Sequence, residues 1–262
     1  GVVCGRGVAE LRRTEREVHL MGVAGGPRVK NGNIVMYVDA LNSKSYSGSG
    51  TTWSDLSSNG NDGTLQNSPT YSSDGNFDFD GTNDRVVFSD TPFRINGTQI
   101  TFATWVEHKD TNRRDTIMGK RQDSPFHQYN MTFGESPYNS NSDNRVFCFF
   151  RSDGNASTAN VVYDLDSYDA GPMHIAFVCN TTSQQLYING VEKATGSTDF
   201  TGETFNITDR DFVLCDVCVG SNTTYGSAPM DGKMYNAVLY DTALTAAEVL
   251  EMYESTRGRF GL

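Results

Sequence analysis

The chain has 262 residues and a formal net charge of −11, with 37% hydrophobic and 20% charged residues. That length fits one large β-sandwich or two small domains, and no apolar run approaches the length of a membrane span. An acidic chain lacks the basic face with which proteins bind duplex nucleic acid, so we expect neither nucleic acid nor a membrane as a partner.

Residues 1–30 differ in charge from everything that follows. They hold six Lys/Arg and three Asp/Glu, a balance of +3, whereas the remaining residues hold 15 and 29, a balance of −14. Apolar residues at heptad-like spacing predict a short amphipathic helix, followed by a glycine-rich hinge. Such a helix cannot bury its apolar stripe alone, so we interpret the segment as an anchoring arm that orders on a partner, with a floppy tail as the alternative. The residues expected to hold the partner are Arg6, Val8, Leu11, Arg12, Arg13, Arg16 and Val18.

Residues 31–262 read as one domain of short strands joined by Gly, Asn, Asp and Ser. Strands about ten residues apart, with turn signals between them, are typical of a sandwich or jelly roll. A long loop over residues 42–76 interrupts the pattern, and we expect Trp53 and Leu56 to pin it to the body. The predicted strands cover residues 33–40, 77–79, 85–88, 99–107, 116–120, 128–133, 146–150, 173–179, 185–189, 211–219 and 230–240.

The end of the chain predicts a strand that is buried on both faces and then a short helix. Thr245 and Glu248 form a capping box, in which each side chain satisfies an orphan N–H group at a helix start. The predicted faces of the strand are Met234, Asn236, Val238 and Tyr240 on one side and Tyr235, Ala237 and Leu239 on the other. The apolar stripe of the helix comprises Val249, Leu250, Met252 and Tyr253.

Three further stretches carry family-like motifs. Residues 79–86 read FDGTNDRV, residues 100–106 read ITFATWV, and His174-Ile175-Ala176 is followed by QLYING at 185–190. Together with the final strand and helix, and in this order, they resemble the motifs of laminin-G-like, concanavalin A-like lectin domains over about residues 31–255. The resemblance implies an all-β fold: a concanavalin A-like antiparallel β-sandwich, or jelly roll, with a short C-terminal helix behind an N-terminal arm.

Residues 33–65 are more particular, because they resemble the entry segment of such domains in virion proteins of tailed bacteriophages. This resemblance implies a location on the virion surface, as a capsid decoration or fibre component. The partners would be other virion proteins through the arm, and glycans of the host surface; a homo-oligomer is compatible with this role. The alternatives are a free carbohydrate-binding module or adhesin and, more weakly, a glycan-cleaving enzyme.

Catalytic patterns are missing from the sequence. The resemblance to glucanases would require acids at alternate positions, E-x-D-x-E, on one strand, but the nearest match is Asp164-Leu165-Asp166 without a third acid. There is no G-x-S-x-G motif for a serine nucleophile. We expect His174 to be a structural strand residue and His108 and His127 to be solvated in loops. The sequence therefore predicts a protein that is not an enzyme.

Metal sites are weakly indicated. Cys215 and Cys218 lack a second pair of ligands and, on a strand, would point to opposite faces, so core cysteines are the favoured interpretation. The family resemblance implies a loop-bound calcium ion, for which Asp80 and Asp84 are the candidate ligands. The same residues suit a tight turn. Tyr235 also stands where the family has an acid, which counts against a metal; no other cofactor is expected.

Carbohydrate binding is what the resemblance implies for the loops. It would use aromatic faces with nearby amides and carboxylates. We expect Trp105 to lie in the core and nominate aromatic residues near loops instead, namely Phe126, Tyr129, Tyr138, Tyr168 and Tyr225.

Overall fold

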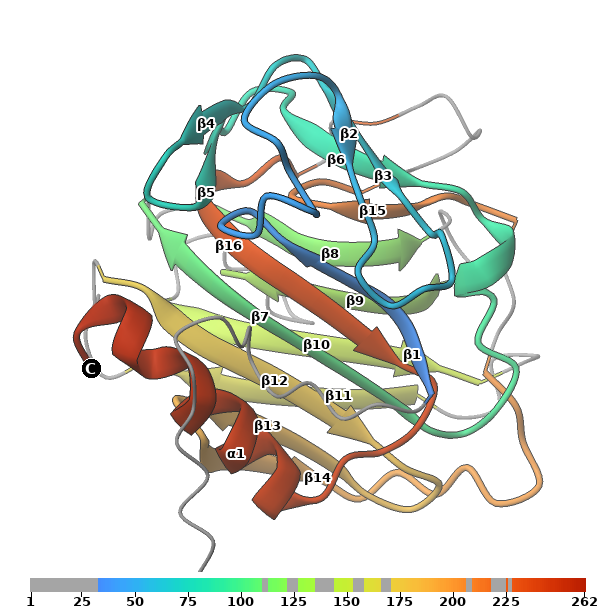
Figure 1. Ribbon diagram of the computed structural model, residues 1–262. Helices are drawn as coiled ribbons and strands as arrows, with labels where there is room; N and C mark the ends of the chain where they lie inside the picture. Colours follow the sequence, from blue (N-terminus) through green and yellow to red (C-terminus); the bar gives the residue numbers. More distant parts are fainter. Residues whose placement is uncertain are drawn as a thin grey trace, which may run out of the picture.

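The computed structural model of the chain describes residues 33–109, 113–121, 127–134, 144–152, 158–165, 171–205, 209–217, 225 and 228–262. The predicted anchoring arm and its seven partner-contacting residues, Arg6 to Val18, lie outside the described residues. Within the described residues, two antiparallel sheets of eight strands each pack face to face, which confirms the predicted sandwich (Figure 1).

Sheet A has the spatial order β14-β13-β12-β7-β16-β5-β4, and β1 also pairs with β16. Its strands are β1 (Ile34–Asp39), β4 (Thr70–Ser72), β5 (Asn76–Asp80), β7 (Ile100–His108), β12 (Met173–Cys179), β13 (Gln184–Ile188), β14 (Val191–Gly196) and β16 (Asp231–Tyr240). β16 is the longest strand and lies in the middle of the sheet, between β7 and the pair β1 and β5. The predicted closing strand is thus the centre of sheet A.

Sheet B has the spatial order β11-β10-β9-β8-β15-β6-β3-β2. Its strands are β2 (Thr52–Trp53), β3 (Gly63–Gln66), β6 (Arg85–Phe88), β8 (Asp115–Arg121), β9 (His127–Phe133), β10 (Arg145–Arg151), β11 (Thr158–Asp164) and β15 (Phe212–Leu214). A one-turn 3-10 helix, η1 (Thr91–Phe93), leads from β6 of sheet B towards β7 of sheet A.

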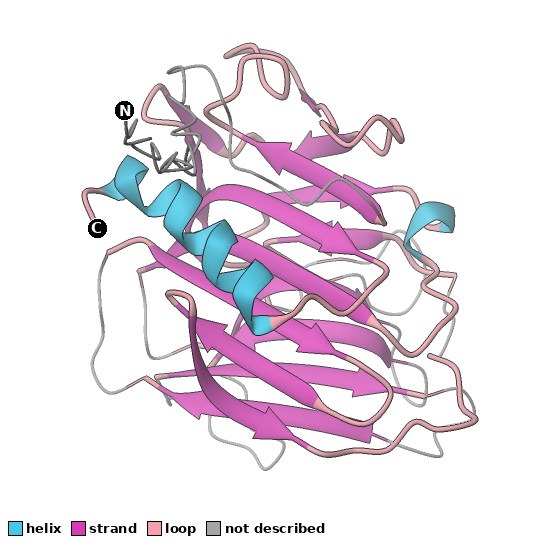
Figure 2. Cartoon of the chain, turned by 60° about the horizontal axis from the view of Figure 1, so that its bottom comes forward, coloured by secondary structure: helices cyan, strands magenta, loops and turns pink. Residues whose placement is uncertain are grey.

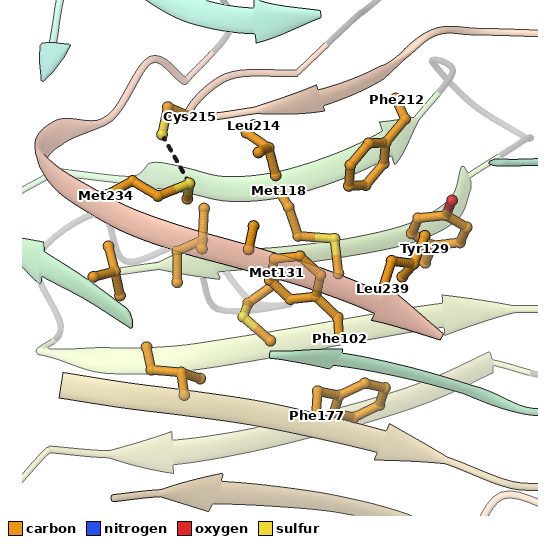
Figure 3. Packing of buried hydrophobic residues seen from close by; sticks show 14 of the residues in the cluster. Phe102, Met118, Tyr129, Met131, Phe177, Phe212, Leu214, Cys215, Met234 and Leu239 are labelled. Carbon is orange, nitrogen blue, oxygen red and sulfur yellow. Dashed lines mark hydrogen bonds between the residues drawn. The ribbon is translucent and has the colours of Figure 1, made fainter. Parts of the chain in front are cut away.

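The main core lies between the two sheets and is formed by alternate residues of their strands (Figure 3). Phe150 of β10 and Phe177 of β12 meet across it, with their ring centroids 5.1 Å apart. Each large apolar side chain that is fully buried stabilises the fold by about 1.5–3 kcal/mol relative to exposure. Apolar residues at every second position therefore hold the two layers together.

A β-bulge in β16 changes the predicted alternation. The register against β7 shifts between Met234 and Asn236, so that one extra residue is inserted at this point. Met234 consequently packs in the main core with Ala237, whereas Val238 packs on the opposite side of the sheet. The prediction that Met234 and Val238 share a face is wrong, because a single inserted residue reverses the period-2 pattern.

The C-terminal helix α1 (Ala246–Thr256) covers the outer face of sheet A (Figure 2). Its capping box is confirmed: the Thr245 hydroxyl accepts from the Glu248 N–H, and the Glu248 carboxylate accepts from the Thr245 N–H. Val249 and Met252 are buried as predicted, but Leu250 is exposed. Trp105 is buried against this helix and the following 3-10 helix η3 (Arg257–Phe260), rather than between the sheets.

The segment predicted as a long loop contains three short strands, β2, β3 and β4. Trp53 is fully buried with its ring 4.8 Å from that of Phe77, so its predicted pinning role is confirmed. The following turn satisfies the backbone of β1 with side chains: Asp55 accepts from the Tyr37 N–H, and the Asn61 amide donates to the Val35 carbonyl. These polar contacts cover the edge of β1 where no strand pairs with it.

Three other predictions of secondary structure need correction. β11 and β14 were missed, because both are polar edge strands with a weak apolar alternation. β15 ends at Leu214, well before the predicted end at residue 219. The reason is local: Cys215 has a φ of 63°, a left-handed conformation that ends the extended chain. No helix in the described part of the chain is both long and apolar enough to cross a membrane.

Candidate functional site

The outward side chains of β10 form a compact surface on sheet B. Val146, Cys148 and Phe150 point into the main core, so the intervening residues point outward. We call this surface the β10 outer face; it consists of Arg145, Phe147, Phe149 and Arg151. α1 lies on the opposite side of the molecule, against sheet A, as Figure 1 shows with β10 and β11 behind that sheet.

Phe149 lies between two asparagines in one row across the sheet. It is directly opposite Asn160 of β11 and directly opposite Asn130 of β9. Asn160 is exposed, Phe149 is half-buried, and Asn130 is only 4% exposed. Side chains directly opposite on one face of a sheet have their Cβ atoms about 4.5–5.5 Å apart, so the amides flank the ring.

The buried end of this row contains an unpaired acceptor. Asn130 Oδ1 is buried and has no hydrogen-bond partner. Gly119 of β8 is the next residue in the row, and a Cβ atom on it would lie 2.9 Å from Asn130 Oδ1. Glycine therefore leaves the room that the asparagine amide occupies. A buried carbonyl oxygen without a partner is costly, and a ligand hydroxyl could recover that cost only if neighbouring side chains moved aside to expose the oxygen.

This arrangement can hold a sugar ring. The apolar face of a pyranose packs on an aromatic ring, and amides beside the ring bind the hydroxyl groups at the sugar's edge. Phe147 lies beside Phe149, with their ring centroids 6.4 Å apart, but it is only 4% exposed and offers no open face of its own. The β10 outer face thus offers one partly exposed aromatic ring, that of Phe149, with amide groups on both sides of it.

Of the five aromatic residues nominated from the sequence, two lie within the described residues. Tyr129 is fully buried among aromatic core residues (Figure 3), and its hydroxyl donates to the Phe93 carbonyl at 2.9 Å. Burial raises the pKa of Tyr129 well above its usual value. Its interpretation as an exposed aromatic is wrong, because it occupies an inward position of β9. Phe126, Tyr138 and Tyr168 lie outside the described residues.

Tyr225 is half-buried and belongs to a charged cluster instead of an open platform. The Arg85 guanidinium lies 4.7 Å from its ring centroid, and its hydroxyl donates to Asp211 Oδ2 at 2.9 Å. Arg85 also pairs with the buried Asp216 at 3.1 Å. The ring of Tyr225 therefore already has a cation as its partner.

Phe149 was missed because the run VFCFF reads as a strand that is buried on both faces. A wider window shows that Arg145 stands two positions before Phe147 and Arg151 two positions after Phe149. Polar ends at this period-2 spacing indicate that residues 145, 147, 149 and 151 share the outward face. The flanking asparagines have no signal in the sequence, since only the strand pairing brings residues 130 and 160 to the sides of residue 149.

The candidate calcium ligands use their oxygens within a turn. Asp80 Oδ1 accepts from the Thr82 N–H at 2.8 Å, and Asp84 Oδ2 accepts from the Asp80 N–H at 3.3 Å. Gly81 has a φ of 69°, which such a turn requires. Burial and the neighbouring Asp80 charge raise the pKa of Asp84. Among the described residues, no group of three or more His, Cys, Asp or Glu side chains could hold a metal ion.

The two histidines whose side chains the structure describes, His108 and His174, are both buried strand residues. His174 is a buried strand residue, as predicted, but His108 is also buried, so its prediction as a solvated residue is wrong. The His108 ring stacks on Phe133, and its Nε2 lies 2.9 Å from Asp115 Oδ2. The side chain of His127 lies outside the described part.

The cysteines and the acidic pair offer no assembled catalytic group within the described residues. Cys148, Cys179 and Cys215 are buried, and burial raises the pKa of each thiol, which keeps them protonated and inert. Cys218 is not among the described residues. Asp164 forms an ion pair with Arg145 at 2.9 Å, and Asp166 is not described.

Comparison with known proteins identifies the family. The family described as the concanavalin A-like lectin/glucanases superfamily (Laminin_G_3) matches residues 79–250, more than half of the chain. No curated protein matches the sequence. Among solved structures, the receptor-binding domain of botulinum neurotoxin D aligns with 86% of this chain and 53% of its own at a TM-score of 0.62 and 11% identity.

Two further structures share the fold. The first is the ligand-binding domain of botulinum neurotoxin serotype D in complex with N-acetylneuraminic acid, with a TM-score of 0.57 and 10% identity. The alignment covers 86% of this chain and 51% of the toxin domain. The second is Trypanosoma rangeli sialidase in complex with sialic acid, with a TM-score of 0.59 and 12% identity. The alignment covers 87% of this chain and 33% of the sialidase. The chain spans about half the length of these toxin domains. The match over residues 79–250 and the observed sandwich together show that the chain belongs to the concanavalin A-like lectin/glucanase superfamily.

Proposed function

We propose that this protein is a non-enzymatic glycan-binding protein that binds its glycan on the β10 outer face. The observation that carries the proposal is Phe149, a half-buried aromatic ring between the amides of Asn130 and Asn160. The lectin-like sandwich is compatible with this role. Two proteins with a similar fold, the toxin domain and the sialidase described above, were solved in complex with N-acetylneuraminic acid and sialic acid, which also supports this role.

A glycan array of bacterial surface polysaccharides tests the proposal. The wild-type protein should bind at least one polysaccharide, and Phe149→Ala should weaken that binding by about tenfold or more, as expected for a central aromatic contact. Leu250→Ala is the matched control, because Leu250 is an exposed apolar residue on α1, against the other sheet. Equal loss in both variants, or unchanged binding in Phe149→Ala, would contradict the proposal.

We further propose that the protein is displayed on the surface of a bacteriophage virion. The support is the resemblance of residues 33–65 to the entry segment of such domains in tailed-phage virion proteins, together with the basic composition of residues 1–30. The arm would contact other virion proteins and the sandwich would contact host glycans or stabilise the shell. Mass spectrometry of purified phage particles should find the chain at a fixed copy number, and deletion of residues 1–30 should abolish its incorporation.

The competing functions differ in measurable ways. A free carbohydrate-binding module or adhesin would bind the same glycan but would not copurify with particles. A glycan-cleaving enzyme would release reducing sugar, and that activity would depend on Asp164 or Asp166. Asp164 is held by Arg145 in an ion pair, an arrangement that suits a structural carboxylate better than a general acid.

A further inference from the structure

We infer that the β10 outer face binds acidic polysaccharides and that Arg145 and Arg151 select their carboxylates. This inference rests on the proposed glycan-binding function and specifies its ligand class. The two arginines occupy the same face as the phenylalanines, at the two ends of the stripe. A planar guanidinium binds a carboxylate through paired N–H donors, whereas the flanking asparagines suit neutral hydroxyl groups.

The spacing of the arginines indicates how the ligand lies. Arg151 follows Arg145 by six positions, which at roughly 3.3 Å per residue places their Cα atoms about 20 Å apart along the strand. Between them, Phe149 is partly exposed and Phe147 is buried. A glycan that follows β10 would therefore stack a neutral sugar on Phe149 and present carboxylates at the two ends. This fits a polysaccharide whose acidic sugars are separated by several neutral ones.

The surroundings of the arginines are compatible with an anionic ligand. Arg145 is 20% exposed and is paired through Nε with Asp164, which is 72% exposed at the sheet edge. A guanidinium carries five N–H donors, so one ion pair does not by itself prevent it from binding a ligand carboxylate. Arg151 lies opposite Thr158 and is half-buried. Both side chains are thus partly shielded, where a charged contact is stronger than in open solvent.

A polysaccharide fits these features better than a single-stranded nucleic acid. Aromatic rings on a sheet also stack nucleobases, but such sites lie in positively charged grooves that follow a dense row of phosphates. Here two arginines stand far apart on a body whose charge balance is −14 over residues 31–262. That body repels a dense polyanion more strongly than it repels a glycan with sparse carboxylates.

The test measures binding of the full chain to gellan and xanthan, in which neutral sugars separate the uronic acids, to the carboxyl-reduced form of each, and to an oligothymidylate. We expect tighter binding to at least one acidic polymer than to its reduced form, and a decrease of that affinity as salt rises. Arg145→Gln and Arg151→Gln should each weaken acidic binding by about tenfold and change binding of the reduced polymer by less than about twofold. The matched control is Arg257→Gln, an exposed arginine on the sheet A side that pairs with Glu254.

Three other outcomes would each contradict a different part of the inference. Equal binding of acidic and reduced polymers that is lost in Phe149→Ala would overturn the selection of carboxylates and leave the proposed function intact. Preference for oligothymidylate would overturn the ligand class. Failure to bind any of these polymers, or any array polysaccharide, would overturn the proposed function itself. The salt dependence of the wild-type protein is decisive even if an arginine variant fails to fold.

Discussion

At the scale of single residues, Asn130 and Gly119 form a matched pair on sheet B. The glycine has no side chain where the asparagine amide lies, and the amide keeps an unpaired oxygen on the same face as Phe149. We infer that the absence of a Cβ atom at position 119 keeps this acceptor in place for a ligand.

Gly119→Ala tests that inference. The added methyl group would lie 2.9 Å from Asn130 Oδ1 and 3.2 Å from Val217 Cγ2, so the amide must move. We expect a folded protein whose glycan affinity falls by about tenfold, the equivalent of roughly 1.4 kcal/mol, because one polar contact is misplaced. Calorimetric titration with the tightest-binding polysaccharide gives the affinity, and Asn130→Ala should produce a similar loss. Unchanged affinity in both variants would remove Asn130 from the site.

His174 links the fold to pH at the same scale. It is buried under α1, its Nδ1 has no hydrogen-bond partner, and burial lowers its pKa from 6.5 to about 3. Below pH 6.5 the unfolded chain therefore binds a proton at His174 that the folded chain does not bind. The contribution of neutral His174 to the free energy of unfolding is thus present above pH 6.5 and is lost as pH falls towards 3. The loss by pH 4 should be on the order of 3 kcal/mol.

Urea unfolding at pH 7, 5 and 4 measures this loss. The wild-type protein should lose stability over this range faster than His174→Gln, and the difference between the two curves isolates residue 174 from the other titrating groups. Parallel curves would show that His174 titrates normally in the folded protein.

At the scale of elements, a buried hydrogen bond ties the end of helix α1 to sheet A. The Trp105 indole N–H donates to Thr256 Oγ1 at 2.7 Å, and both residues are buried. The Trp105 ring stacks on Phe260, with centroids 4.2 Å apart. Arg259 fixes the same end of the chain, since its guanidinium binds Asp39 Oδ1 at 3.0 Å and the Gly75 carbonyl at 2.7 Å.

Thr256→Val should destabilise the protein by about 1–3 kcal/mol, because it leaves a buried indole N–H without an acceptor while it preserves shape. Ser255→Ala is the matched control: Ser255 also donates to the Met252 carbonyl, but it is exposed and contacts no tryptophan. Its cost should stay below about 0.5 kcal/mol. Chemical denaturation of both variants gives the comparison, and equal costs would refute the role of the Trp105 bond.

Sequence reasoning at this scale succeeded where local chemistry decides the structure. Thr245 and Glu248 predicted the helix start correctly because both partners of the capping box are local. The alternation in β16 was predicted without its bulge, because the extra residue is set by pairing with β7, more than a hundred residues away. β11 and β14 were missed for a related reason: an edge strand is stabilised by its neighbour and needs little apolar pattern of its own.

At the scale of the whole molecule, a buried ion pair joins three distant segments. Lys120 of β8 is fully buried, and its ammonium contacts Asp90 before η1 and the Arg210 carbonyl. Burial lowers the pKa of Lys120 and outweighs the opposing effect of Asp90. Removal of one partner leaves a buried charge uncompensated, which costs far more than the pair itself contributes.

Asp90→Ala should therefore destabilise the fold by about 3–5 kcal/mol, and most of this cost should disappear in a Lys120→Met background. Asp78→Ala is the control: its ion pair with Lys109 is on the surface and should contribute less than about 1 kcal/mol. The denaturant midpoints of the two single variants and the double variant give the free energies for a double-mutant cycle. Additive costs for Asp90→Ala and Lys120→Met would contradict the coupling.

The candidate site could be predicted from the sequence only in part, because it exists at the scale of the whole molecule. Strand spacing and turn residues predict a sandwich, and the resemblance of the motifs to lectin-like domains implies carbohydrate as the ligand class. They do not indicate the surface, because residues 130, 149 and 160 become neighbours only through the pairing of β9, β10 and β11. The nomination of Tyr129 illustrates the difficulty: it is adjacent in sequence to Asn130, but one position along a strand reverses the face.

The most direct test of the central claim is to map the glycan on the folded protein by backbone amide chemical shifts. The titration should use the polysaccharide fragment that binds most tightly on the array. We predict that the largest shifts fall on β9, β10 and β11, centred on Asn130, Phe149 and Asn160, with α1 unchanged. Largest shifts at α1, or at the Asp80–Asp84 turn, with β10 unchanged would contradict it.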